Sequence, residues 1–240
     1  MIIAAADANN HHVLVGHHRR YYGLVDAART MIQRGDLGKL LAVNGQWTVL
    51  KADTYFEPDW RKKKEAGPVL INLVHELDTL RYICGEISSI SAETSSMVRG
   101  HDAEETAALL IRFDNGALGT FLMSDAAPSP WAWEFATGEN PAFPGHYENV
   151  CRFMGTNAAL EFPNLKIWRY VDSERGWHFA MRPQDISIPL GDAFAHQCAH
   201  FCAVVRGEEQ PRITAEDATR SLAATVAVFD AMETGRRITL

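Results

Sequence analysis

The sequence predicts an α+β fold, in which a large, mostly antiparallel open sheet carries helices on one face and is preceded by one short αβ unit. Strand-like runs follow one another closely through the middle of the chain, as in antiparallel sheets. Amphipathic helical runs stand before and after them, so helices and strands are segregated along the sequence. Residues 1–18 hold one helix-like and one strand-like run, which form the preceding unit.

The preceding unit consists of a helix over 4–10 and a buried parallel strand over 11–16. One αβ unit cannot cover both faces of a parallel strand, so this strand needs a sheet from elsewhere. We therefore expect residues 1–18 to be the remnant of one domain and residues 19–240 to form a second domain.

The second domain begins with alternating helical and extended patterns. Apolar residues recur at helical spacing over 22–34, and residues 40–50 alternate in the manner of a strand. A loop rich in charged and aromatic residues follows over 51–66. A Gly-Pro pair then opens an apolar helix over 69–84, which Gly85 ends.

Strand-like runs fill the centre of the chain. They cover 87–98, 106–113, 117–124, 150–155, 159–162 and 165–170. Asp114-Asn115-Gly116 predicts a tight hairpin between the second and third runs. The Pro-, Gly- and aromatic-rich segment 126–147 is expected to be a long loop, and helices over 193–206 and 215–234 close the chain before a terminal strand or tail.

Charge and composition exclude two classes of partner. The net charge is −7, and the sequence offers no basic face for a nucleic acid. No apolar run reaches the roughly 18 residues that a membrane span requires. The four cysteines are too irregularly spaced for a disulfide framework, so we expect reduced thiols and a cytoplasmic location.

Five motifs resemble the family of glucose-fructose oxidoreductase, inositol 2-dehydrogenase and rhizopine-catabolism proteins. They lie at 13–22 (VLVGHHRRYY), 35–39 (GDLGK), 67–78 (GPVLINLVHELD), 114–119 (DNGALG) and 207–220 (a Gly, a Pro and DATR), in the family's order. The resemblance extends from about residue 4 to residue 240. It implies that 1–18 end a Rossmann nucleotide-binding domain and that 19–240 form the substrate-binding and oligomerisation domain.

The same resemblance implies an oxidoreductase that uses NAD or NADP to transfer hydride to or from a sugar, polyol or related hydroxy compound. The chain lacks the family's G-x-G-x-x-G phosphate loop and its Glu-Lys-Pro motif, which supplies the active-site lysine. Ile71 also stands where the family usually has Asp, with Asn72 the nearest polar residue. We expect a truncated chain that is inactive alone and does not bind the cofactor. The alternative is a non-catalytic sugar-binding or dimerisation module.

His75 is the predicted catalytic base. A neutral imidazole can accept a hydroxyl proton at neutral pH, and the resemblance places this residue in the family's active-site helix. The competing interpretation is a core histidine bonded to Asp78, three residues later on the same helix.

Further residues are predicted to bind substrate or cofactor. Aromatic planes, cations and hydrogen-bonding side chains suit a polyhydroxylated ligand, although a charged loop can also be merely solvated. The predicted substrate-binding residues are Lys51, Tyr55, Trp60, Arg61, Asn72 and Arg19, and the predicted cofactor contact is Arg20.

A metal site is not predicted. His196 and His200 share one face of a helix, while Cys198 and Cys202 lie about 200° away from roughly 100° per residue. The four side chains therefore cannot ligate one ion. A three-ligand zinc motif, which a hydrolase would need, is also missing from the sequence.

The predicted sheet has two apolar faces. The runs Leu-Leu-Ile-Arg-Phe at 109–113 and Gly-Thr-Phe-Leu-Met at 119–123 place large side chains on both sides. Helices cover one side, and a second copy of the same sheet is the simplest cover for the other. We therefore expect a homodimer or homotetramer assembled through the sheet.

Overall fold

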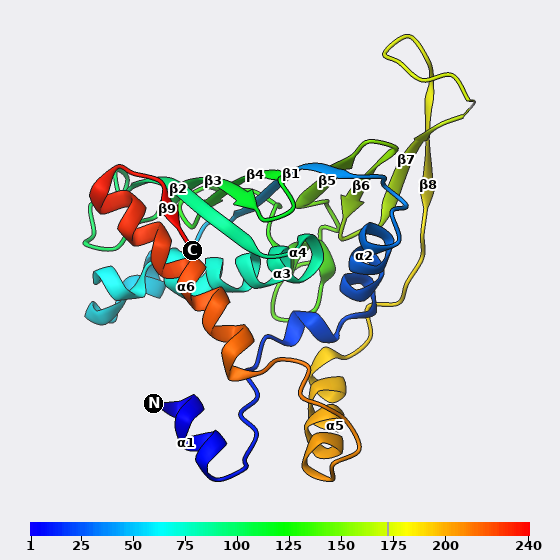
Figure 1. The fold of residues 1–240 in the computed structure, drawn as a ribbon. Coiled ribbons are helices and arrows are strands. Elements are labelled where there is room, and N and C mark those ends of the chain that lie inside the picture. Colours follow the sequence, from blue (N-terminus) through cyan, green and yellow to red (C-terminus); the bar gives the residue numbers. More distant parts are fainter. Residues whose placement is uncertain (172) are drawn as a thin grey trace.

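A computed structural model describes residues 1–171 and 173–240. Their strands form one sheet in the order β8-β7-β6-β5-β1-β4-β3-β2-β9 (Figure 1). The strands are β1 (Leu40–Thr48), β2 (Ile87–Ser95), β3 (Thr106–Phe113), β4 (Leu118–Ser124), β5 (Cys151–Gly155), β6 (Ala158–Phe162), β7 (Lys166–Tyr170), β8 (Met181–Asp185) and β9 (Ile238–Thr239). The pairing of β1 with β4 is parallel and the other described pairings are antiparallel. The predicted fold class is confirmed.

The helices lie on one side of this sheet, with α1 and α5 farther from it than the others (Figure 1). They are α1 (Ile2–Ala8), α2 (Gly23–Gln33), α3 (Val74–Cys84), α4 (Trp133–Thr137), α5 (Ala193–Val205) and α6 (Ala215–Thr234). The space between α3 and the sheet is filled by a hydrophobic core that excludes solvent. Its members Leu77, Ile90, Met123 and Phe153 are each fully buried. Burying one such side chain contributes about 1.5–3 kcal/mol to folding. No helix in the described ranges is long and apolar enough to cross a membrane.

The hairpin between β3 and β4 forms as Asp114-Asn115-Gly116 predicts. The strands pair antiparallel up to Arg112 opposite Leu118. Gly116 takes a φ of +88°, which a residue with a Cβ adopts only under strain. Asn115 fixes the turn, because its Oδ1 accepts from the Ala117 N–H at 3.0 Å and its Nδ2 donates to the Cys84 carbonyl at 2.8 Å.

The predicted parallel strand over 11–16 does not form. The helix before it is present as α1, but the segment itself makes a single antiparallel bridge, between Leu14 and Thr214. A ladder of hydrogen bonds needs a neighbouring strand along its whole length. Among the described residues, the only bridge partner of this segment is Thr214, directly before α6, so the segment does not join a sheet.

The helix predicted over 69–84 begins with one π-helical turn, Val69–Leu73, and continues as α3. Glu104 holds this turn, since its Oε1 accepts from the Val69 N–H at 2.8 Å. A Cβ on Gly67 would lie 2.2 Å from that same Oε1, so a side chain at this position would displace the carboxylate. π-Helical turns occur frequently at functional sites.

One α-helix and one strand were among the elements that the sequence analysis did not predict. The segment expected to be a loop over 126–147 contains α4, which is too short to show a helical period. Strand β8 was missed because all five of its residues are exposed, so no apolar alternation marks it. It pairs with β7 and extends the sheet into the long projecting arm that Figure 1 shows beside β7 and β8.

Candidate functional site

Three imidazole rings meet where α3 begins. His75 lies in its first turn and is half-buried. Its ring centroid is 6.0 Å from that of His17 and 6.1 Å from that of His18, and both pairs meet edge to face. His17 and His18 come from the segment that leads into α2. The cluster therefore joins this segment to the start of α3.

The environment of His75 keeps its imidazole neutral. Burial lowers its pKa to about 4, and the positive charges of Arg19, His17 and His18 act in the same direction. Among the described residues neither ring nitrogen of His75 has a hydrogen-bond partner within the chain. The competing interpretation, a bond to Asp78, is not observed, because Asp78 accepts instead from Arg20 and Ser221.

His75 should therefore show a measurable pH dependence. A pKa of about 4 in the folded state, below the ordinary value of 6.5, means that the unfolded chain binds the proton more tightly. The stability contributed by neutral His75 is thus present above pH 6.5 and is lost as the pH falls from 6.5 through 4. NMR titration of the His75 ring should give a midpoint well below 6. A midpoint of 6.5 or higher would contradict this environment.

Lys51 and Asn72 meet beside this cluster. The Lys51 Nζ donates to Asn72 Oδ1 at 3.0 Å and lies 3.2 Å from Asp125 Oδ2. Burial lowers the pKa of Lys51, and Asp125 opposes that shift. Asn72 belongs to the π-helical turn, three residues before His75. The structure therefore brings these two predicted substrate-binding residues together at the start of the α3 helix.

The aromatic residues of the 51–66 loop pack against cations. The Lys51 Nζ lies 4.8 Å from the Tyr55 ring centroid, and the Arg61 guanidinium lies 4.1 Å from the same ring. Arg61 also donates to the Tyr55 carbonyl at 2.7 Å and lies 5.3 Å from the Trp60 ring. Trp60 is 59% exposed, so an aromatic surface remains open to a ligand.

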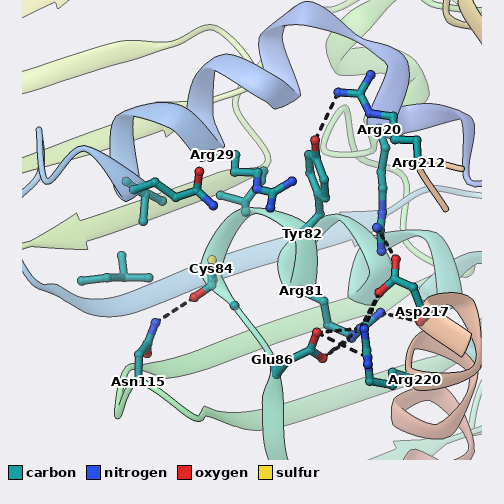
Figure 2. Close-up of a pocket in the computed structure, with 15 residues that line it drawn as sticks. Arg20, Arg29, Arg81, Tyr82, Cys84, Glu86, Asn115, Arg212, Asp217 and Arg220 are labelled. Atoms are coloured by element: carbon teal, nitrogen blue, oxygen red, sulfur yellow. Dashed lines mark hydrogen bonds and ion pairs between the residues drawn. The ribbon is translucent and has the colours of Figure 1, made fainter. Parts of the chain in front are cut away.

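Arg19 and Arg20 are both buried and paired with carboxylates. Arg19 donates to Glu76 Oε1 at 2.5 Å and to Glu134 Oε1 at 3.4 Å. Arg20 donates two hydrogen bonds to Asp78, at 2.9 and 2.6 Å, and one to Asp217. Arg20 further lines a separate cavity at the other end of α3 (Figure 2). The predicted roles of these arginines in substrate and cofactor binding stay predictions.

Sequence reasoning missed His17, His18 and Glu139 as members of the site. Burial alone would raise the pKa of Glu139, but hydrogen bonds from His18 and Trp133 lower it to about 2. The Trp133 Nε1 donates to Glu139 Oε2 at 2.6 Å. His17 and His18 are neighbours in the sequence, and because their segment does not form a strand, both rings lie near the ring of His75.

The α5 histidines make hydrogen bonds within the protein. His200 Nδ1 is 3.0 Å from the Tyr21 hydroxyl, and His196 Nδ1 is 3.2 Å from the Tyr21 carbonyl. In the part of the chain that the structure describes, no group of three or more His, Cys, Asp or Glu residues is placed to hold a metal ion.

Comparison with known proteins identifies relatives of this chain. The sequence model named GFO_IDH_MocA_C, described as "Oxidoreductase family, C-terminal alpha/beta domain", matches residues 29–240. Scyllo-inositol 2-dehydrogenase (NAD(+)) of Bacillus subtilis is 24% identical over 232 residues, which cover 94% of this chain and 62% of that protein. For 1,5-anhydro-D-fructose reductase of Ensifer adhaerens the identity is 26% over 248 residues, and the coverage is 98% of this chain and 66% of that protein.

Solved structures share the fold. The WlbA dehydrogenase from Chromobacterium violaceum, in complex with NADH and UDP-GlcNAcA, superposes with a TM-score of 0.74 at 19% identity, covering 99% of this chain and 65% of that one. A NAD-binding protein from Listeria innocua gives a TM-score of 0.75 at 18% identity, with 100% and 70% coverage. This chain thus spans about two thirds of the length of the relatives it matches. The resemblance noted in the sequence is confirmed.

Proposed function

The chain belongs to the Gfo/Idh/MocA oxidoreductase family, and from this premise we propose that residues 19–240 are the substrate-binding and oligomerisation domain of an NAD(P)-dependent enzyme. Its substrate would be a sugar, polyol or related hydroxy compound. Two relatives support this substrate class, because scyllo-inositol and 1,5-anhydro-D-fructose are both cyclic polyhydroxy compounds. Residues 1–18 would be the end of the nucleotide-binding domain.

One observation carries the proposal: the imidazole of His75 is neutral, none of the described residues bonds to its ring nitrogens, and Asn72, which is bonded to Lys51, lies three residues before it. His75 accepts the hydroxyl proton of a bound alcohol as its carbon is oxidised. Lys51 and Asn72, 3.0 Å apart, hold neighbouring hydroxyls. The open ring of Trp60 packs on the apolar C–H face of the substrate.

The nicotinamide cofactor, where bound, supplies the hydride acceptor or donor. The described residues do not fit its pyrophosphate, which normally rests on a glycine-rich loop at a helix N-terminus. The sequence has no G-x-G-x-x-G. Arg20, the one predicted cofactor contact, is held by Asp78 and Asp217. We therefore assign cofactor binding to a part of the enzyme outside this chain.

We expect the 240-residue chain alone to bind NADH and NADPH weakly or not at all. The same chain joined to the nucleotide-binding domain of the Bacillus subtilis relative should bind at least one of them saturably. Calorimetry and quenching of NADH fluorescence measure both. Micromolar binding by the chain alone would contradict the assignment of cofactor binding to a part outside this chain. A joined protein that binds nucleotide but oxidises no polyol would favour the alternative, a non-catalytic sugar-binding or dimerisation module.

We propose a homodimer or homotetramer that forms through the uncovered sheet face. Leu110, Leu118 and Leu122 are 63%, 51% and 45% exposed there, opposite the helices. A charge at the centre of such a face is costly to desolvate, so Leu110→Glu should shift sedimentation from an oligomer to a monomer. Val171→Glu, on an exposed residue just after β7, is the matched control and should leave the oligomer intact. A monodisperse wild-type monomer at micromolar concentration would contradict this.

A reducing compartment such as the cytoplasm fits the thiols of the chain. Cys84 and Cys151 are buried and Cys198 and Cys202 are exposed, all as free thiols. Exposed thiols persist where the surroundings keep them reduced.

A further inference from the structure

A cavity of about 580 Å³ lies at the C-terminal end of α3, bounded by α2 and by the start of α6 (Figure 2). Arg81, the lining residue of α3 nearest to His75 in the sequence, is six residues from it, which corresponds to roughly 9 Å along the helix at 1.5 Å per residue. The cavity is therefore distinct from the candidate catalytic site. Its volume is within the range of small-molecule pockets, about 300–1,000 Å³.

Arginines dominate the wall of this cavity. They are Arg20, Arg29, Arg81, Arg212 and Arg220. Four of them have carboxylate partners. Arg20 pairs with Asp78 and Asp217. Arg81 and Arg220 each pair with Glu86 and Asp217, and Arg212 pairs with Asp26. Five guanidinium groups thus share four carboxylates, and the network carries one uncompensated positive charge.

That charge is on Arg29. Among residues 1–171 and 173–240, no carboxylate lies within 4.0 Å of its guanidinium, and its Nε is buried without a hydrogen-bond partner. The guanidinium lies 4.1 Å from the centroid of the Tyr82 ring, and that of Arg20 lies 4.9 Å from the same ring. Arg20 is already compensated by Asp78 and Asp217, so an anion in the cavity would compensate the charge of Arg29.

The cavity also holds groups that disfavour an anion, the carboxylates of Glu86 and Asp217 and the end of α3, but both carboxylates are already paired with arginines. The C-terminal end of a helix presents carbonyl oxygens with partial negative charge, and α3 ends at this cavity. The Cys84 carbonyl is already bonded to Asn115 Nδ2 at 2.8 Å, as Figure 2 shows. Tyr82 donates its hydroxyl proton to Asp26 at 2.6 Å, which leaves its ring free to support Arg29.

We propose that this cavity binds a small organic oxyanion, one that carries phosphate or carboxylate groups, with Arg29 as its main ligand. A planar guanidinium presents two parallel N–H donors that match phosphate and carboxylate oxygens. The cavity exceeds the size of a single inorganic ion, so part of the ligand lies against its apolar wall, at Ile32 and Ile83. The site does not depend on proton transfer at His75.

Calorimetry with inorganic pyrophosphate and with citrate, at matched ionic strength, tests the proposal on the 240-residue chain. At least one probe should bind saturably, and the probe that binds more tightly shows whether the site takes phosphate or carboxylate groups. Arg29→Gln should weaken that binding by about tenfold or more, because one charge-assisted pair is removed. Arg169→Gln removes the same charge from an exposed residue of β7 and should leave the dissociation constant unchanged.

Arg29→Lys keeps the charge but loses the paired donors, and it should weaken binding less than Arg29→Gln does. It also keeps the test valid should the glutamine variant fail to fold, which its thermal melt would reveal. The proposal is overturned if neither probe binds saturably. It is equally overturned if Arg29→Gln and Arg169→Gln weaken binding alike, since the effect would then be general charge screening. Neither outcome would bear on nucleotide binding or on the role of His75.

Discussion

Replacing His75 with alanine should lower turnover roughly 10²–10⁴-fold, the usual contribution of a general base, in an enzyme where this chain is joined to a nucleotide-binding domain. The imidazole is neutral because burial lowers its pKa to about 4, and none of the described residues bonds to its nitrogens. Alanine removes the proton acceptor and leaves the remaining polar contacts of the site in place. Reduction of NAD⁺ by a cyclic polyol such as scyllo-inositol measures the effect.

The loss should fall on kcat more than on KM, since Lys51 and Asn72 still hold the substrate hydroxyls. His178→Ala, at an exposed histidine of the projecting arm, is the matched control and should leave both constants unchanged. The urea midpoint of His75→Ala should change little, because a half-buried ring supports little of the core. Turnover within threefold of wild type would exclude His75 as the base.

Local pattern was sufficient for the elements whose signal lies within a few residues. Asp114-Asn115-Gly116 specifies a hairpin through its own conformational preferences, and β3 alternates buried and exposed residues. The period of 215–234 likewise predicts α6 at its observed bounds. β8 gave no such signal, because a strand exposed on both faces has no alternation to detect.

The π-helical turn at the start of α3 could not be predicted for a different reason. One extra residue in a single turn hardly alters an apolar period. Its cause is tertiary, because the Glu104 carboxylate arrives from far along the chain and accepts the Val69 N–H. Gly67 was visible in the sequence as a helix opener, but its need to admit a buried carboxylate was not.

Some residues of the candidate site could be predicted from the sequence and others could not. His75, Asn72 and Lys51 could be identified because they lie on one helix turn and on the loop that leads into it. His17 and His18 could not be assigned, because their positions depend on how the segment before α2 crosses α3. The same contact pairs Arg19 with Glu76 and Arg20 with Asp78, and adjacent residues in the sequence do not reveal such partners.

Asp78→Asn should destabilise the fold by about 3–5 kcal/mol, the cost of leaving a buried ion pair without one partner. Asp78 is 1% exposed and accepts from Arg20 at 2.9 and 2.6 Å and from Ser221 at 2.6 Å. His17 Nε2 and an Arg81 nitrogen lie 3.7 and 3.9 Å from it. Removing its charge leaves Arg20, itself 4% exposed, to share Asp217 with Arg81 in a site where water compensates little.

Urea unfolding measures this loss of stability. The interaction between Arg20 and Asp78 is isolated by comparing a double variant with the two single variants. Arg20→Leu with Asp78→Leu replaces both charges by apolar groups, so it should be less destabilised than the sum of the two single leucine changes. Asp59→Asn removes the same charge from an exposed pair with Lys62 and should leave the unfolding midpoint unchanged. Asp78→Asn with wild-type stability, or strict additivity in the double variant, would show that the carboxylate does not anchor the segment before α2 to α3.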